Sequence, residues 1–134
     1  MKKPLIGEIW VTAIPIIYYD KNKDINVKIQ KRPVLVIDDG RGLIVEEDKR
    51  NYHVFKVTSQ PDSYKRKLIK NWKELGLKKK SYIRIEMPIK IEEGQFINKI
   101  SSLSSKDLKE YYVELFKLLN IDALKEMAEQ ENLI

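Results

Sequence analysis

The sequence contains no cysteine and a single histidine, His53. The lack of cysteine excludes disulfide bonds, thiolate metal sites and a cysteine nucleophile, and it fits a reducing compartment. The apolar run at residues 34–37 is far shorter than the roughly 20 residues that a membrane-spanning helix needs. Pro4 and Glu8 interrupt the N-terminal apolar stretch, so we predict no signal peptide. We therefore expect a soluble cytoplasmic protein with no membrane partner.

The motifs of the common catalytic sites are also missing. No histidine pair has the spacing of a zinc site, and neither a Gly-rich phosphate loop nor a dinucleotide-binding fingerprint occurs. Acidic residues cluster beside predicted turns, which favours solvated loop charges over metal ligands. We therefore expect no metal and no cofactor. His53 is a candidate general base, but a lone histidine in a strand is more often structural or at the surface.

Positive charge is abundant and unevenly distributed. The 26 basic and 20 acidic residues give a net charge of +6. Residues 65–80 contain one acidic side chain, Glu74, and carry a net +7, so the rest of the chain sums to −1. The basic side chains of this segment are Lys65, Arg66, Lys67, Lys70, Lys73, Lys78, Lys79 and Lys80. This concentration indicates a polyanion or an acidic protein as partner, and a solvated helix face is the alternative explanation.

Alternating apolar residues and β-branched residues predict strands in the first half of the chain. The expected strands cover residues 6–15, 26–30, 34–37, 43–45, 52–57, 82–86 and 89–91. Residues 20–24 form a predicted polar loop, and the Asp- and Gly-rich residues 38–42 form a predicted turn. Pro88 is expected to end a strand or to mark an edge.

Helical spacing appears twice after these strands. Tyr64, Leu68, Trp72 and Leu75 recur at helical intervals before Gly76, which predicts a short mid-chain helix with a basic face. Trp10 and Trp72 both lie on apolar stripes and are assigned to the core. A second helix is predicted to follow Ser104 and to end near residue 120, with a short helix after Asp122. Strands followed by helices indicate an α+β domain with a small antiparallel barrel.

Two polar groups flank predicted strands: Lys31-Arg32-Pro33 precedes the central one, and Thr58-Ser59-Gln60 follows another. When a 2′-hydroxyl of RNA attacks the adjacent phosphorus, negative charge develops on the phosphoryl oxygens, and a guanidinium can stabilise it. A hydroxyl can orient the phosphate or relay a proton. Arg32 and Thr58 therefore suffice for RNA cleavage in principle, and we expect them to face one cleft. Taken alone, Arg32 is more often a surface cation.

Five short motifs in a consistent order carry a family resemblance. They are Gly7-Glu8-Ile9-Trp10-Val11, Lys31-Arg32-Pro33 with the apolar residues 34–37, Thr58-Ser59-Gln60, Trp72-Lys73-Glu74-Leu75-Gly76-Leu77 with Ser81-Tyr82-Ile83-Arg84, and residues 97–104. Together they resemble the MazF/PemK (Kid) family of toxin endoribonucleases. The resemblance covers residues 6–119 of one domain spanning residues 1–134. Residues 121–134 extend beyond the family's usual end and are expected to be helical.

The resemblance implies a fold, an activity and partners. The fold is an SH-three-like antiparallel barrel of the CcdB/MazF type with helices, usually in a homodimer. The activity is metal-independent, sequence-selective cleavage of single-stranded RNA to 2′,3′-cyclic phosphate and 5′-hydroxyl ends. Arg32 would stabilise the transition state and take part in proton transfer, while Thr58 would orient the phosphate. The partner protein would be an acidic antitoxin that occupies the RNA groove.

Further residues are candidates for RNA contacts. They are Lys31, Ser59, Gln60, Lys78, Lys79, Lys80, Tyr82 and Arg84. Tyr18, Tyr19, Tyr52 and Tyr82 are candidates for stacking on unpaired bases, with ordinary packing as the alternative. The segment at residues 16–30 lacks the glycine that the family's first loop usually contains, so the target sequence does not carry over. The alternative functions are a non-catalytic RNA-binding module of the same fold and a CcdB-like toxin directed at a protein.

Overall fold

The computed structural model describes residues 3–39, 51–60, 66–119 and 121–130. The chain divides into two compact units, Met1–Leu103 and Ser104–Ile134. The first unit holds the strands, and the second holds the helices α1 (Ser105–Leu119) and α2 (Ile121–Gln130). The two predicted C-terminal helices are thus confirmed. None of the helices in the described part of the chain is long and apolar enough to span a bilayer.

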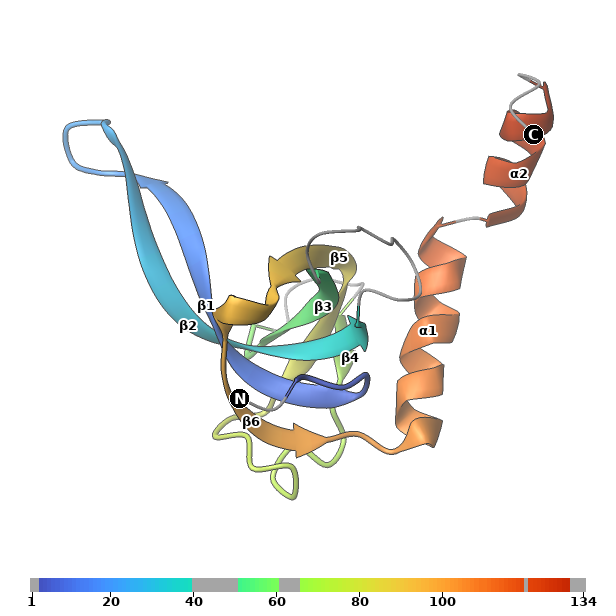
Figure 1. The fold of residues 1–134 in the computed structure, drawn as a ribbon, viewed down its shortest axis with the longest axis horizontal. Coiled ribbons are helices and arrows are strands. Elements are labelled where there is room, and N and C mark those ends of the chain that lie inside the picture. The colour runs from blue at the N-terminus through green and yellow to red at the C-terminus, as the bar shows by residue number, and fades with distance from the viewer. Residues whose placement is uncertain (1–2, 40–50, 61–65, 120, 131–134) are drawn as a thin grey trace. The chain divides into compact units, whose positions relative to one another are not determined.

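The first unit is a curled, half-barrel sheet of antiparallel strands (Figure 1). Its strands are β1 (Glu8–Tyr19), β2 (Ile25–Asp38), β3 (Asn51–Thr58), β4 (Arg66–Leu68), β5 (Tyr82–Glu92) and β6 (Phe96–Ser102). They are arranged in the order β4-β5-β3-β2-β1-β6, and a short 3-10 helix, η1 (Glu93–Gln95), joins β5 to β6. A small α+β fold with an antiparallel sheet is therefore confirmed.

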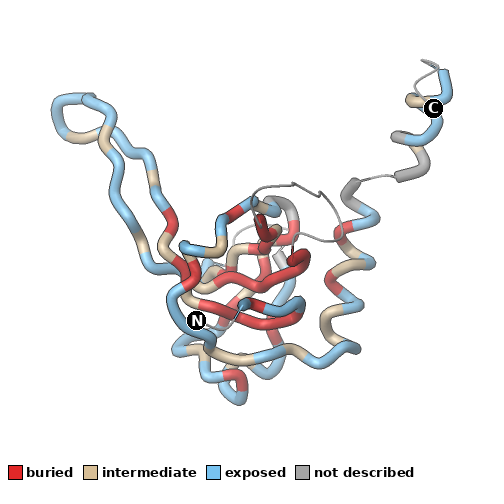
Figure 2. The backbone as a smooth tube through the Cα atoms, in the orientation of Figure 1, coloured by how far each residue is buried: buried red, intermediate tan, exposed pale blue. Residues whose placement is uncertain are grey.

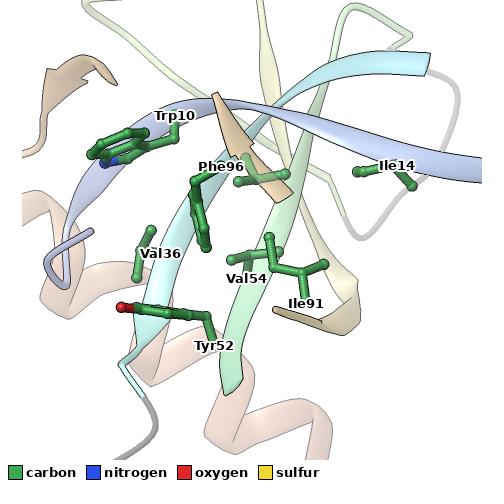
Figure 3. Close-up of a cluster of buried hydrophobic side chains, with 8 residues drawn as sticks. Trp10, Ile14, Val36, Tyr52, Val54, Ile91 and Phe96 are labelled. Atoms are coloured by element: carbon green, nitrogen blue, oxygen red, sulfur yellow. The ribbon is translucent and has the colours of Figure 1, made fainter. Parts of the chain in front are cut away.

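A cluster of buried hydrophobic side chains from β1, β2, β3, β5 and β6 lies inside the curve of the sheet (Figure 3). Phe96 of β6 packs edge-on against two aromatic rings, with centroid distances of 5.7 Å to Trp10 and 4.9 Å to Tyr52. Edge-to-face contacts of this kind add to the free energy gained from burial alone. The alternate residues of β2, Leu35 and Ile37, are also buried. Residues 34–37 are thus buried on both faces of the sheet, as a central strand requires.

The β1–β2 hairpin extends beyond the core (Figure 2), and this corrects the expected strand ends. Strand β1 continues past Pro15 to Tyr19, and β2 is continuous from Ile25 to Asp38. The predicted loop at residues 20–24 closes the hairpin. The Asp20 carboxylate accepts hydrogen bonds from the backbone N–H groups of Asn22 at 2.9 Å and Asp24 at 3.0 Å. This compact turn lets cross-strand pairing continue to the tip.

The predicted mid-chain helix is wrong in its described part, residues 66–76. Residues 66–68 form β4, and the backbone N–H of Ile69 donates to the carbonyl of Ser81 at 2.9 Å. Pairing with β5 thus places Ile69 in the core and leaves Leu68 39% exposed. The predicted helix had Leu68, and not Ile69, on its apolar stripe. Trp72 is only half-buried, with the Lys73 ammonium 5.5 Å from its ring centroid, so its assignment to the core is also wrong.

Gly76 nevertheless ends a single turn in the way that a helix C-terminal glycine does. Its φ is +84°, and its N–H donates to the Lys73 carbonyl at 3.0 Å, while the N–H of Leu77 donates to the Trp72 carbonyl at 3.1 Å. These two bonds are the pattern of a Schellman motif. The glycine was thus correctly assigned, although the helix before it does not form.

Pro88 does not end a strand. It lies within β5 and pairs with Phe55 at an irregularity in the β3–β5 ladder, between Phe55 and Val57. A proline is tolerated at such a bulge because no ladder hydrogen bond is needed from its nitrogen. The two strands predicted at residues 82–86 and 89–91 are therefore one. The predicted strand at residues 43–45 and Tyr64 lie outside the described residues.

Candidate functional site

A cavity of about 850 Å³ opens on the sheet unit. Residues from β1, β2, β3, β5 and β6 and from the segment before β5 line it. The polar lining residues are Gln30, Lys31, Arg32, Lys56, Thr58, Ser59, Gln60, Lys78, Lys79, Ser81, Arg84 and Asn98. Its apolar surface comes from residues such as Val11, Ile16 and Leu77. A volume of this size accommodates a ligand of one or a few nucleotides.

Arg32 is held at this cavity from two sides. Its backbone lies opposite Thr12 of β1, whose fully buried hydroxyl donates to the Arg32 carbonyl at 2.9 Å. Its side-chain Nε donates to Oε1 of Gln30 at 2.9 Å. The guanidinium has five N–H donors in a rigid fork. The bond to Gln30 uses one of them and leaves the outer edge of the fork for a ligand.

Thr58 is the last residue of β3, where it pairs with Tyr82 of β5. Its Oγ1 accepts a hydrogen bond from the backbone N–H of Gln60 at 3.2 Å. The β2–β3 ladder ends at the pair of Val34 with Lys56, and Arg32 and Thr58 each lie two residues beyond this pair on adjacent strands. The structure thus places both residues in the lining of one cavity, from adjacent strands.

The charged side chains in the described lining of the cavity are all positive. Six of the described lining residues are cations: Lys31, Arg32, Lys56, Lys78, Lys79 and Arg84. No aspartate or glutamate occurs among the described residues that line it. Charges of one sign around a concave surface concentrate counter-ions there and accelerate their association. The cavity is therefore suited to an anion with several negative charges.

The segment that presents Lys78 and Lys79 is fixed at both ends. The Schellman motif at Gly76 fixes its start. At its end, the buried Ser81 donates from Oγ to the Lys79 carbonyl at 2.6 Å. Lys78 and Lys79 are both exposed. A short backbone segment, held at both ends by hydrogen bonds, therefore carries two exposed lysines at the cavity.

Most predicted site residues meet at this cavity, but Tyr18, Tyr19, Tyr52, His53, Lys80 and Tyr82 are not part of its described lining. Those in its lining are Lys31, Arg32, Thr58, Ser59, Gln60, Lys78, Lys79 and Arg84. The exposed Lys80 and the half-buried Tyr82 are absent from the described lining, although each adjoins a lining residue. Tyr52 is fully buried in the core, so it packs against other side chains and cannot stack on a base.

His53 lies away from the cavity. Its Nδ1 is 2.8 Å from Oδ2 of Asp38, and the two side chains are 13% and 3% exposed. His53 is at the opposite end of β3 from the cavity-lining Thr58 and is not part of the described lining. The histidine is therefore a half-buried partner of a carboxylate, and the geometry does not support its use as a general base at this cavity.

Several residues that line the cavity were not recognisable as site residues from the sequence. Gln30 and Lys56 sit in strands where an isolated polar side chain is ordinary, and Asn98 lies on β6. Only the pairing of β2 with β3 and of β1 with β6 brings them to one place.

A search against models of known protein families and against curated proteins finds no match to this chain. The geometry of the cavity therefore carries the functional argument.

Proposed function

We propose that the chain is a metal-independent endoribonuclease of the MazF/PemK type, the toxin of a toxin–antitoxin module. The observation that carries this proposal is the cavity in which Arg32 and Thr58 lie together among six cations, with no acidic side chain in its described lining. Such a cavity selects a phosphodiester chain over a neutral ligand. Apolar lining residues beside the cations suit bases as well as phosphates.

The residues support a transesterification. The substrate's O2′ attacks the adjacent phosphorus, a new P–O2′ bond forms, and the P–O5′ bond breaks. O2′ loses its proton to solvent and O5′ takes one up, which gives a 2′,3′-cyclic phosphate and a 5′-hydroxyl. The free edge of the Arg32 guanidinium stabilises the charge that develops on the non-bridging oxygens. The Thr58 hydroxyl donates to the same phosphate and orients it for in-line attack.

The arrangement of the motifs also favours the family. Gly7-Glu8-Ile9-Trp10-Val11 leads into and forms the start of β1, while Lys31-Arg32-Pro33 lies in β2. Thr58 ends β3, and the Ser81–Arg84 motif leads into β5. The motifs quoted for the resemblance thus meet on neighbouring strands around one cavity. On this proposal, the curled sheet is an SH-three-like barrel of the CcdB/MazF type.

The proposal also specifies partners. Single-stranded RNA reaches a cavity of this size more readily than a duplex, because its backbone bends and its bases are unpaired. An acidic antitoxin would compete with RNA for the same cations. The protein would act in the cytoplasm, where its mRNA substrate is found.

End mapping on a long single-stranded RNA in excess EDTA tests the proposal. We expect discrete fragments with cyclic-phosphate and 5′-hydroxyl ends from the wild-type protein. Arg32→Ala should bind the RNA but leave it intact, because the position is exposed at the cavity and outside the core. Lys80→Ala is the matched control, a cation outside the described lining, and should cleave normally. RNA bound but uncut by the wild-type protein would point instead to a non-catalytic RNA-binding module.

A further inference from the structure

The outer part of the β1–β2 hairpin, residues 15–29, forms an arm with one uncharged face, which we call the apolar face. Paired residues, and residues two apart on a strand, point to the same side of a sheet. The apolar face therefore carries three cross-strand pairs: Pro15 with Ile29, Ile17 with Val27, and Tyr19 with Ile25. All six side chains are exposed to solvent, and Ile17 and Tyr19 reach 72%. The Tyr19 hydroxyl is the one polar side-chain group among these six residues.

The arm lacks the support that a β-ribbon normally has. Strand β6 pairs with β1 only as far as Thr12, and β3 pairs with β2 only from Val34. Beyond these points, β1 and β2 pair only with each other in the described part of the chain (Figure 1), and exposed residues predominate along the arm (Figure 2). An isolated two-stranded ribbon is marginally stable in water. A contiguous apolar patch of this kind on a folded protein marks a binding surface.

The unit that carries the arm is strongly basic. Residues 1–103 hold 22 basic and 13 acidic side chains, a net charge of +9, while residues 104–134 sum to −3. The tip of the arm is neutral overall, because Asp20 and Asp24 balance the exposed Lys21 and Lys23. A net positive charge draws a protein toward a surface of anionic lipid. The unit as a whole therefore supplies this attraction, and the tip of the arm does not oppose it.

We propose that the arm binds the surface of an anionic phospholipid membrane, with the apolar face inserted at the boundary between headgroups and acyl chains. Insertion removes the aliphatic side chains from water, while the basic unit is attracted to the lipid phosphates. Stable anchoring at a membrane surface requires two signals of this kind together. Lys21 and Lys23 can extend their ammonium groups to the phosphates while their methylene stems contact the acyl chains. The inference rests on the arm and the net charge and does not depend on the proposed ribonuclease activity.

The open edges of the arm limit how deeply it inserts. Beyond Thr12 and Val34, the outer edges of β1 and β2 have no third strand in the described part of the chain. Backbone N–H and C=O groups on such edges cannot be left without partners in hydrocarbon. The arm should therefore lie flat at the level of the headgroups, with one face inserted. The expectation of no membrane partner rests on the lack of a spanning segment, and a surface contact needs none.

The chemistry of the apolar face favours lipid over other partners. RNA and acidic proteins bind through cations and hydrogen-bond donors, and this face offers them only the Tyr19 hydroxyl. A protein partner would need a surface shaped to fit a ribbon of two strands. A fluid bilayer adapts to any exposed apolar face, and its anionic headgroups are complementary to the net charge of +9 on residues 1–103.

Flotation of the whole chain with lipid vesicles tests the proposal. The wild-type protein should float with vesicles of equal parts phosphatidylcholine and phosphatidylglycerol, and less of it should float with phosphatidylcholine alone. The double variant Ile17→Gln/Val27→Gln should bind the mixed vesicles at least roughly a hundredfold more weakly, since each inserted aliphatic side chain contributes at least about tenfold. Leu68→Gln/Ile97→Gln is the matched control, because it removes two exposed aliphatic side chains of the same unit outside the arm, and it should bind like the wild type.

The two double variants separate insertion from electrostatic attraction, because both keep the net charge of +6. The substituted arm positions lie outside the core, and an unchanged thermal unfolding curve would show that the arm variant folds. A wild-type protein that stays free of the mixed vesicles would overturn the proposal. So would an arm variant that binds as tightly as the wild type, because the basic side chains alone would then account for the binding.

A polarity-sensitive fluorophore on an introduced thiol locates the contact. The native sequence has no cysteine, so each variant carries one label. With the mixed vesicles, emission from the label at Val27→Cys should shift to the blue, whereas a label at Tyr18→Cys, exposed on the opposite face of the arm, should change little. Equal shifts at the two positions would contradict the proposed orientation. A blue-shifted label at Val27→Cys before vesicles are added would mean that a protein surface, such as a second copy, already covers the apolar face, and would overturn the proposal.

Discussion

The Nε atom of Arg32 donates a hydrogen bond to Oε1 of Gln30, two residues earlier on β2, at 2.9 Å. Residues two apart on a strand share a face, so this bond holds the guanidinium along the cavity wall. Among the described residues no carboxylate forms an ion pair with it, which keeps its positive charge available. Gln30 is therefore a positioning residue for the cation that the proposed chemistry requires.

Removal of this support should slow catalysis more than it weakens binding. We expect Gln30→Ala to lower kcat roughly fivefold to tenfold with KM nearly unchanged, since one hydrogen bond of about 1 kcal/mol orients Arg32. Steady-state cleavage of a short RNA measures both constants. Lys28→Ala, on the same face but outside the described lining, is the control and should leave kcat unchanged. An unaltered kcat in Gln30→Ala would show that Arg32 needs no such support.

Adjacent lysines should differ in their contribution to RNA binding. Lys79 lines the cavity and Lys80 does not. Lys79→Ala should weaken RNA binding and reduce the slope of log affinity against log salt concentration by about 0.7, as expected for one phosphate contact on a single strand. Lys80→Ala should leave the slope of log affinity against log salt concentration unchanged. Fluorescence anisotropy across a salt series measures it, and equal effects of the two variants would mean that the segment binds RNA only through its overall charge.

Glu8 should make the fold sensitive to acid. Its carboxylate accepts hydrogen bonds from the Leu5 N–H at 2.6 Å and from Trp10 Nε1 at 3.1 Å, and it pairs with Lys99 at 2.8 Å. Burial alone would raise the pKa of Glu8, but the hydrogen bonds from Lys99, Leu5 and Trp10 together lower it below the ordinary value of 4.5. A lowered pKa contributes stability above that value, and this contribution is lost as pH falls below it.

Urea unfolding of Glu8→Gln tests this contribution. The variant should be less stable than the wild type by about 1–2 kcal/mol at pH 7, because a charge-assisted buried contact is lost. The difference should shrink as pH falls from 4.5 through the lowered pKa of Glu8, because the unfolded chain takes up a proton before the folded protein does. Glu74→Gln, at an exposed position, is the control. A stability difference that stays constant with pH would show that Glu8 acts through packing alone.

Two glycines should respond differently to alanine. Gly76 has a φ of +84°, a conformation that costs a residue with a side chain roughly 1–2 kcal/mol. A Cβ there would lie 3.7 Å from Ile100, an ordinary contact, so backbone strain is the expected cause of destabilisation. Gly94 has open space around it and no positive φ, so Gly94→Ala should be nearly neutral. Thermal unfolding that ranks the two variants in the reverse order would refute the assignment of the Schellman motif.

The sequence predicted the fold where local pattern and tertiary packing agree. Residues 34–37 are apolar throughout, and burial on both faces of the sheet requires that composition. The mid-chain helix failed because Leu68, Trp72 and Leu75 match a helical period over too short a span. The residue that is buried is instead the neighbouring Ile69, because the pairing of this segment with the chain at β5 turns its side chain into the core. Strand β6 was not predicted as a strand, because it is a polar edge strand with Asn98 and Lys99 exposed.

The site was predictable only in part, for a similar reason. Arg32 and Thr58 were found because their chemistry and their short motifs stand out in the chain. Gln30, Lys56 and Asn98 were not, because strand register alone brings them to the cavity. Residues 16–19 were likewise not predicted as part of a strand, because it is the turn organised by Asp20 that keeps the two exposed strands of the β1–β2 hairpin paired beyond the core.

A comparison of RNA with DNA tests the central claim most directly. The proposed nucleophile is the substrate's own 2′-hydroxyl, so single-stranded DNA of the same sequence should bind through its phosphates and remain uncut. We would incubate the wild-type protein with each strand in excess EDTA and measure both binding and cleavage. Cleavage of the RNA alone, with binding of both strands, is the result that the cavity predicts. Cleavage of the DNA as well would contradict it, because the nucleophile would then have to come from somewhere other than the substrate's 2′-hydroxyl.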